Sequence, residues 1–122
     1  MGNYLTQQQL HSSINGGKGI EQWLGYYDNG GETILKWLRI YPENNTECTV
    51  MYVECYDQGD LEFLDLYAFT VVDPDEPYGL ITTFRSVEEA LAFSIAEYAA
   101  LKDRFVGNGM IQEQYQNYLT SK

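Results

Sequence analysis

The sequence contains few basic residues for its length. Seven Lys and Arg stand against eighteen Asp and Glu, so the formal net charge is −11. A surface of this charge repels nucleic-acid phosphates and anionic lipids, and it attracts basic proteins. We therefore expect no direct contact with nucleic acid or with a membrane, and we expect the partner to be a basic protein.

Cysteine and long apolar segments are also scarce. The chain has two cysteines, Cys48 and Cys55, which are too few for a disulfide scaffold. Their odd separation along one strand would place them on opposite faces, so we expect two free, buried thiols in a reducing compartment. No apolar run approaches the ~20 residues of a membrane-spanning helix, and no secretion signal opens the sequence. These features predict a cytoplasmic protein with a single domain over residues 1–122.

Residue types that carry catalysis or metal binding are sparse or isolated. His11 is the only histidine, and its serine neighbours along the predicted helix do not face it. Neither cysteine has a histidine near it in the sequence, which argues against Cys–His catalysis and against zinc. The acidic residues at 57–65 and 73–76 do not follow the EF-hand spacing, and Asp is expected at turns for local hydrogen bonding. We therefore predict a non-catalytic protein without a cofactor or a metal.

Five segments in the middle of the chain have the character of strands. They are rich in β-branched and aromatic residues and are separated by turn sequences such as Asp28-Asn29-Gly30-Gly31. Short connections of this kind predict an antiparallel meander. The candidate strands are 20–27, 33–41, 48–56, 61–72 and a shorter one at 80–84.

Helices are predicted at both ends of the chain. Thr6 with Gln9, and Ser86 with Glu89, have the spacing of capping boxes that start a helix. The three predicted helices cover 6–14, 86–105 and 110–119. The expected fold class is α+β: a four- or five-stranded antiparallel sheet with one N-terminal helix and two C-terminal helices packed on it.

Aromatic residues alternate with aliphatic ones along the predicted strands. If the aromatic faces of neighbouring strands coincide, one side of the sheet gathers six rings. Tyr and Trp provide rigid, amphipathic contact area, which suits a protein interface. Two interpretations stay open: helices cover this side and the rings form core, or the side is exposed to a partner. The six rings are Trp37, Tyr41, Tyr52, Tyr56, Tyr67 and Phe69.

We predict partner-binding residues of two kinds. Aromatic residues would anchor the partner, and acidic residues at the turns would form a rim that steers a basic protein toward them. The anchors are Trp37, Tyr41, Tyr52, Tyr56 and Tyr67, and the rim is Asp57, Asp60, Glu62, Asp65, Asp73, Asp75 and Glu76.

These features predict a non-catalytic acidic protein-binding module that recognises a basic partner protein. An inhibitor, an immunity protein, an assembly factor and an adaptor all belong to this class. A nucleic-acid mimic that blocks a nuclease is a special case, in which carboxylates imitate phosphates. The alternative is a small-ligand-binding protein with an aromatic pocket between sheet and helix. A homodimer that buries the aromatic side, and an enzyme of unspecified type, are also left open.

Overall fold

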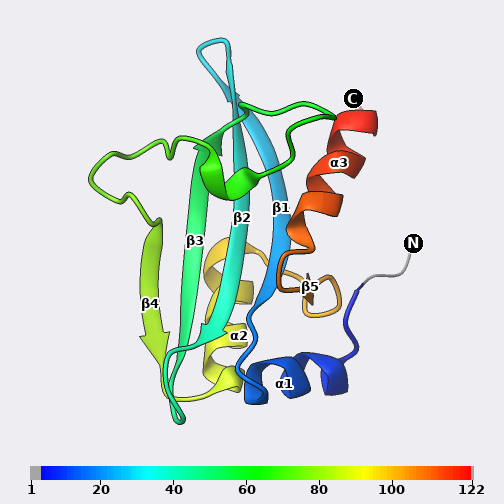
Figure 1. Cartoon of the computed structure of the whole chain (residues 1–122). Helices are drawn as coiled ribbons and strands as arrows, with labels where there is room; N and C mark the ends of the chain where they lie inside the picture. Colours follow the sequence, from blue (N-terminus) through cyan, green and yellow to red (C-terminus); the bar gives the residue numbers. More distant parts are fainter. Residues whose placement is uncertain (1–3, 122) are drawn as a thin grey trace.

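The computed structural model describes residues 4–121 and has the predicted α+β architecture (Figure 1). Its five strands form one antiparallel sheet in the order β4-β3-β2-β1-β5. The strands are β1 (Ile20–Asn29), β2 (Glu32–Pro42), β3 (Cys48–Tyr56), β4 (Leu80–Phe84) and β5 (Val106–Gly107). The helices are α1 (Gln7–Asn15), α2 (Val87–Tyr98) and α3 (Ile111–Ser121), and η1 (Leu66–Ala68) is a 3-10 turn.

Local signals place the long strands β1 to β3, helix α1 and the start of α2 where the sequence predicts them. Gly30 and Gly31 have φ values of 61° and 93°, as the tight β1–β2 turn requires. The Thr6 hydroxyl accepts from the Gln9 amide, and the Gln9 side chain accepts from the Thr6 amide, so the capping box of α1 is formed. Ser86 caps α2 by accepting from the amide of Glu89.

The sheet is covered on both faces. On the α1/α2 face, Leu10 of α1 and Leu91 of α2 pack on Leu38 and Val50 of the central strands. On the α3 face, the core consists of residues from β2, β3, η1 and α3, and Trp37 and Tyr115 are its largest members. Figure 1 shows that α1 and α2 lie at one end of the strands, whereas α3 and η1 lie toward the other.

The prediction of a strand over residues 61–72 is wrong. The chain instead makes a long connection from β3 to β4 that contains η1, and the one backbone bridge that it forms with a strand of the sheet joins Val71 to Cys55. Asp60 and Asp65 accept hydrogen bonds from the backbone amides of Glu62 and Tyr67, at 2.8 and 3.2 Å. These local bonds satisfy backbone groups that a strand ladder would otherwise use.

The predicted helix over 86–105 is too long. It ends at Tyr98, because Ala99 takes the left-handed conformation with φ 59°. The Gln22 side chain then binds both the amide and the carbonyl of Leu101, each at 2.8 Å, in the manner of a neighbouring strand. Phe105 becomes a buried core residue, and β5 follows as a short strand beside β1 that the sequence analysis missed. Tertiary contacts thus override the helix-favouring residues of this segment.

Candidate partner-binding surface

The connection between β3 and β4, residues 57–79, carries all the predicted rim residues, and we call it the acidic connection. It contains no Lys or Arg, and its carboxylates are Asp57, Asp60, Glu62, Asp65, Asp73, Asp75 and Glu76. In Figure 1 it runs across one end of the sheet, from the C-terminal end of α3 to the outer side of β4. The predicted rim residues therefore lie along one continuous segment that spans this end of the sheet.

Three of these carboxylates also hold the local shape of the connection. Asp60 and Asp65 accept from backbone amides two residues ahead, and Asp73 accepts from the amide of Asp75 at 2.9 Å. This is the turn chemistry expected of Asp. Each of these groups has a second oxygen that no such turn requires, so shaping the chain and attracting a basic partner are compatible roles.

Three other carboxylates have no structural role among the described residues. Glu62, Asp75 and Glu76 are exposed, and none of their side-chain carboxylates receives a hydrogen bond or forms an ion pair with a group in residues 4–121. Their charge is therefore not compensated locally. Uncompensated surface charge contributes directly to the field that a cationic partner experiences.

Asp57 differs from the rest of the rim because it binds α3. Its carboxylate accepts hydrogen bonds from the hydroxyls of Tyr115 and Tyr118, the latter at 3.5 Å. Burial, followed by the bond to Asp57, raises the pKa of Tyr115 well above its ordinary value. Asp57 therefore joins the start of the acidic connection to the C-terminal helix.

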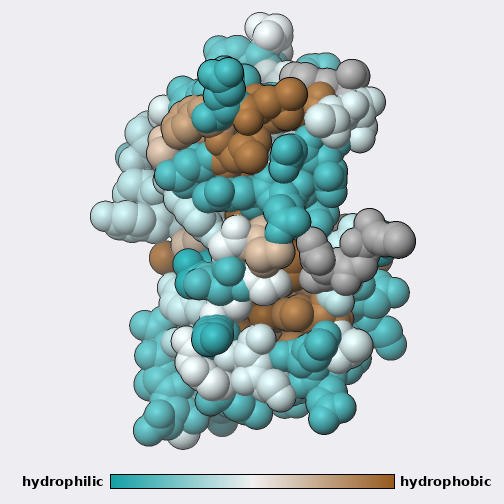
Figure 2. Space-filling model, turned by 45° about the vertical axis from the view of Figure 1, so that its right-hand side comes forward, coloured by the Kyte–Doolittle hydropathy of each residue, from teal (hydrophilic) through white to brown (hydrophobic). Residues whose placement is uncertain are grey.

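Apolar side chains are exposed between these carboxylates. Leu61, Phe63 and Tyr67 lie exposed on the connection, and Tyr78 at its end has 74% of its surface exposed. Figure 2 shows an apolar area bordered by hydrophilic residues on the upper half of the molecule, the end of the sheet at which the connection passes beside α3 in Figure 1. Exposed apolar groups among charges are typical of a surface that binds another protein.

The predicted aromatic anchors do not share one face of the sheet. The β2–β3 register pairs Trp37 with Val53 and Leu38 with Tyr52. Trp37 and Tyr41 therefore lie on the α3 face, whereas Tyr52 and Tyr56 lie on the α1/α2 face. The aromatic face of one strand coincides with the aliphatic face of the next, and the sequence alone does not specify this register.

Most of these rings pack against other side chains of the protein. Trp37 is only 2% exposed, and the ring of Tyr67 meets it edge-on with centroids 5.5 Å apart. Tyr52 stacks on Tyr98 of α2 with centroids 4.1 Å apart. Tyr41 is half-buried beneath the guanidinium of Arg39, 5.7 Å from its ring centroid. Of the five predicted anchors, only Tyr67 is exposed, with 45% of its surface accessible to solvent.

A buried carboxylate that the sequence analysis missed positions Tyr67. Glu21 on β1 is 0% exposed and accepts a hydrogen bond from the Tyr67 hydroxyl. Its other oxygen accepts from the amides of Gly109 and Ile111, at 3.0 and 3.1 Å, at the start of α3. A negative charge is stabilising there because the helix N-terminus carries partial positive charge. No sequence signal distinguishes this Glu from an exposed strand residue.

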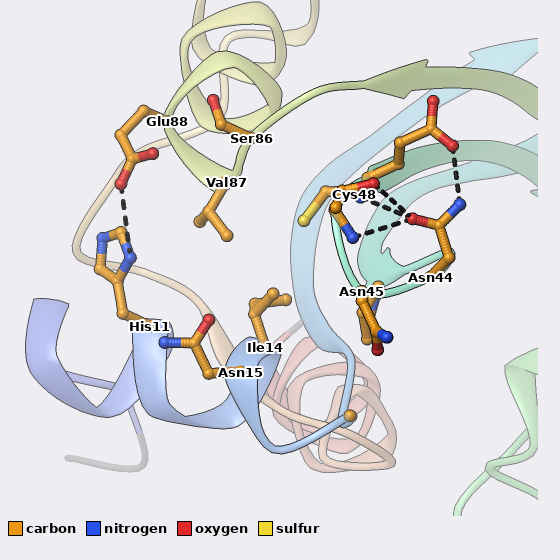
Figure 3. A pocket seen from close by; sticks show the side chains of 13 residues that line it. His11, Ile14, Asn15, Asn44, Asn45, Cys48, Ser86, Val87 and Glu88 are labelled. Carbon is orange, nitrogen blue, oxygen red and sulfur yellow. Dashed lines mark hydrogen bonds and ion pairs between the residues drawn. The ribbon is translucent and has the colours of Figure 1, made fainter.

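A polar pocket of about 560 Å³ lies apart from the acidic connection, between α1, the β2–β3 turn and the start of α2 (Figure 3). The polar residues that line it include His11, Asn15, Asn45 and Glu88. The Nδ1 atom of His11 is 3.7 Å from a carboxylate oxygen of Glu88. Figure 3 shows the Cys48 sulfur facing the pocket interior. The fold thus brings the only histidine and a cysteine to one pocket, which their sequence separation concealed.

The electrostatics of this pocket oppose thiolate chemistry. Burial, with a smaller effect of Glu88, raises the pKa of the Cys48 thiol. His11 and the start of α2 line the same pocket, but the net shift is upward, whereas a nucleophilic cysteine needs a lowered pKa. Cys55 lies in the core on the other face of the sheet, so the two free thiols are separated as predicted. Within residues 4–121, no group of three or more His, Cys, Asp or Glu side chains is arranged to hold a metal ion.

Comparisons with protein-family models, with curated proteins and with solved structures found no match for this chain. In the part of the chain that the structure describes, no helix is both long enough and apolar enough to cross a bilayer.

Proposed function

We propose that this protein is a non-catalytic acidic binding module of the cytoplasm that recognises a basic partner protein through the acidic connection. One observation carries the proposal: seven carboxylates and four exposed apolar side chains share residues 57–79, without a single Lys or Arg. The class includes inhibitors, immunity proteins, assembly factors and adaptors.

The two kinds of residue have separate roles in this proposal. Exposed carboxylates such as Asp75 and Glu76 attract the partner over distances of about 10 Å at moderate salt, and they mainly raise the association rate. Leu61, Phe63 and Tyr78 then bury apolar surface in the complex, which slows dissociation. A basic partner gains from both effects, whereas an acidic protein of the same shape is repelled.

Affinity capture at low and high salt tests this proposal. The wild-type protein is compared with a variant, Glu62→Gln/Asp75→Asn/Glu76→Gln, that removes three carboxylates without removing any hydrogen bond among the described residues. The control, Glu32→Gln/Glu97→Gln/Asp103→Asn, changes the net charge equally at exposed positions outside the connection.

A partner identified by capture is then purified, and its association rate is measured at several salt concentrations. The first variant should associate about tenfold more slowly at low salt and have a shallower salt dependence, whereas the control stays within about twofold of wild type. Equal effects of the two variants would mean that total charge, and not the connection, controls binding. Capture of no basic protein at either salt concentration would refute the proposal.

A second candidate function is the binding of a small polar ligand in the pocket of Figure 3. Its volume of about 560 Å³ is favourable, because ligand sites in proteins commonly occupy roughly 300–1,000 Å³. A ligand that binds only the native state raises the melting temperature. A thermal-shift screen of polar metabolites should therefore find a stabiliser whose effect disappears in Asn15→Leu. Absence of any such stabiliser would count against this candidate.

A further inference from the structure

β4 is an edge strand with an open outer side. It pairs with β3 over five consecutive residues, and within the described chain it has no other strand neighbour. Figure 1 shows it at the border of the sheet, with α2 behind the neighbouring strands β3 and β2. Such an edge presents alternate backbone amides and carbonyls that can pair with another extended chain.

This edge lacks the features that usually prevent such pairing. The strand sequence is Leu-Ile-Thr-Thr-Phe, without a charge or a proline, and its register with β3 has no bulge. Proteins ordinarily protect an edge with Lys, Pro, a bulge or a covering segment. Ile81, which is 51% exposed, and the exposed Leu80 add apolar surface on the two faces beside the edge. β4 is therefore available to a partner through its backbone and its side chains.

Two depressions lie next to the edge. The first, of about 370 Å³, is on the α3 face and is lined by Tyr41, Met51, Tyr78 and Ile81 together with Arg39. The second, of about 200 Å³, lies where the acidic connection enters β4. Its lining includes three carboxylates, Glu54, Asp73 and Glu76, beside apolar surface from Tyr52, Val72 and Leu80. Carboxylates next to apolar surface match the charged head and aliphatic stem of Lys or Arg.

Charge decides between the occupants of this edge. A second copy of the chain would bring two molecules of net charge −11 together at an acidic border, which like-charge repulsion disfavours. A basic extended segment instead places positive charge beside Asp73 and Glu76. We propose that the partner binds by adding an extended segment to β4 as a further strand, with one Lys or Arg side chain in the carboxylate-lined depression. This inference rests on the proposed function and specifies its binding mode.

A peptide of about ten residues that alternates Arg and Val serves as the probe. Its control is the same peptide N-methylated at alternate amides, which retains the charge but cannot complete the backbone pairing. The unmodified peptide should slow hydrogen exchange of alternate amides in β4, and the methylated peptide should bind about tenfold more weakly. Equal binding of the two peptides, or protection confined to residues 57–79, would refute strand addition while leaving the proposed function intact.

Substitutions on the protein provide a second test. Ile81→Lys places a like charge at the edge, and its matched control is Ile95→Lys on α2, where the isoleucine is 42% exposed. Both variants change the net charge equally. Ile81→Lys should weaken the unmodified peptide about tenfold, whereas Ile95→Lys should change the affinity by less than about twofold. Equal weakening by the two variants would overturn the inference, as would self-association through β4 that Ile81→Lys abolishes.

Discussion

Removing the buried carboxylate of Glu21 should destabilise the protein strongly, because one side chain joins three parts of the fold. It accepts from the amides of Gly109 and Ile111 and from the hydroxyl of Tyr67. It thereby joins β1, the start of α3 and the acidic connection. The perturbation that removes all three bonds is Glu21→Ala.

The magnitude follows from the burial of the three donors. Ile111 is 0% exposed, so its amide has no access to water and costs ~1–3 kcal/mol when it loses its acceptor. Gly109 and Tyr67 are exposed residues and can rehydrate in part, at ~0.5–1 kcal/mol each. Relief of the desolvation of Glu21 itself offsets part of this cost. We expect Glu21→Ala to lower the free energy of unfolding by about 3 kcal/mol.

Urea denaturation followed by circular dichroism measures this change, and four further variants provide the comparison. Glu21→Gln retains an oxygen for the two amides and should cost about 1 kcal/mol, as should Tyr67→Phe. The double variant should cost less than the sum, because both changes affect one hydrogen bond. Glu32→Ala, at an exposed position on β2, is the control and should stay within ~0.5 kcal/mol of wild type. A loss below ~1 kcal/mol for Glu21→Ala would refute this reasoning.

Two other predictions concern the tyrosines and the end of α2. Burial and carboxylate neighbours raise the pKa values of Tyr52, Tyr67 and Tyr115 above the ordinary 10.0, so the folded state favours their neutral forms. The stability they contribute is intact below about pH 10 and is lost as the pH rises further, so absorbance at about 295 nm should show these three ionising only with unfolding. Ionisation of all tyrosines near pH 10 in the folded protein would contradict this. Ala99→Gly should raise stability by ~1 kcal/mol in thermal melts because Ala99 has φ 59°, whereas Ala96→Gly within α2 should lower it by a similar amount.

Features determined by adjacent residues could be predicted from the sequence. The capping residues Thr6 and Ser86 and the β1–β2 turn at Gly30 act within a few residues, and the elements they define occur where expected. The acidic character of the candidate surface was equally visible, because residues 57–79 are contiguous. Charge along one exposed segment does not depend on how the rest of the chain folds.

Features determined by distant residues could not be predicted. The end of α2 depends on Gln22, whose amide pairs with Leu101 from a segment far away in the sequence. The rings do not gather on one face as expected, because the β2–β3 register pairs Trp37 with Val53. A register shift of one residue exchanges the faces of a whole strand, so alternation within single strands cannot decide which rings meet.

The acidic connection has an energetic cost that the fold itself does not require. Like charges on residues 57–79 repel one another, and Glu62, Asp75 and Glu76 have no compensating partner among the described residues. The connection nevertheless keeps one shape, because Leu66 and Phe69 are buried in the α3-face core and Tyr67 is bound to Glu21. Neutral residues at the three uncompensated positions would preserve these anchors and reduce the repulsion. The proposed binding of a basic partner accounts for this cost, because the partner would compensate the charges that the fold leaves uncompensated.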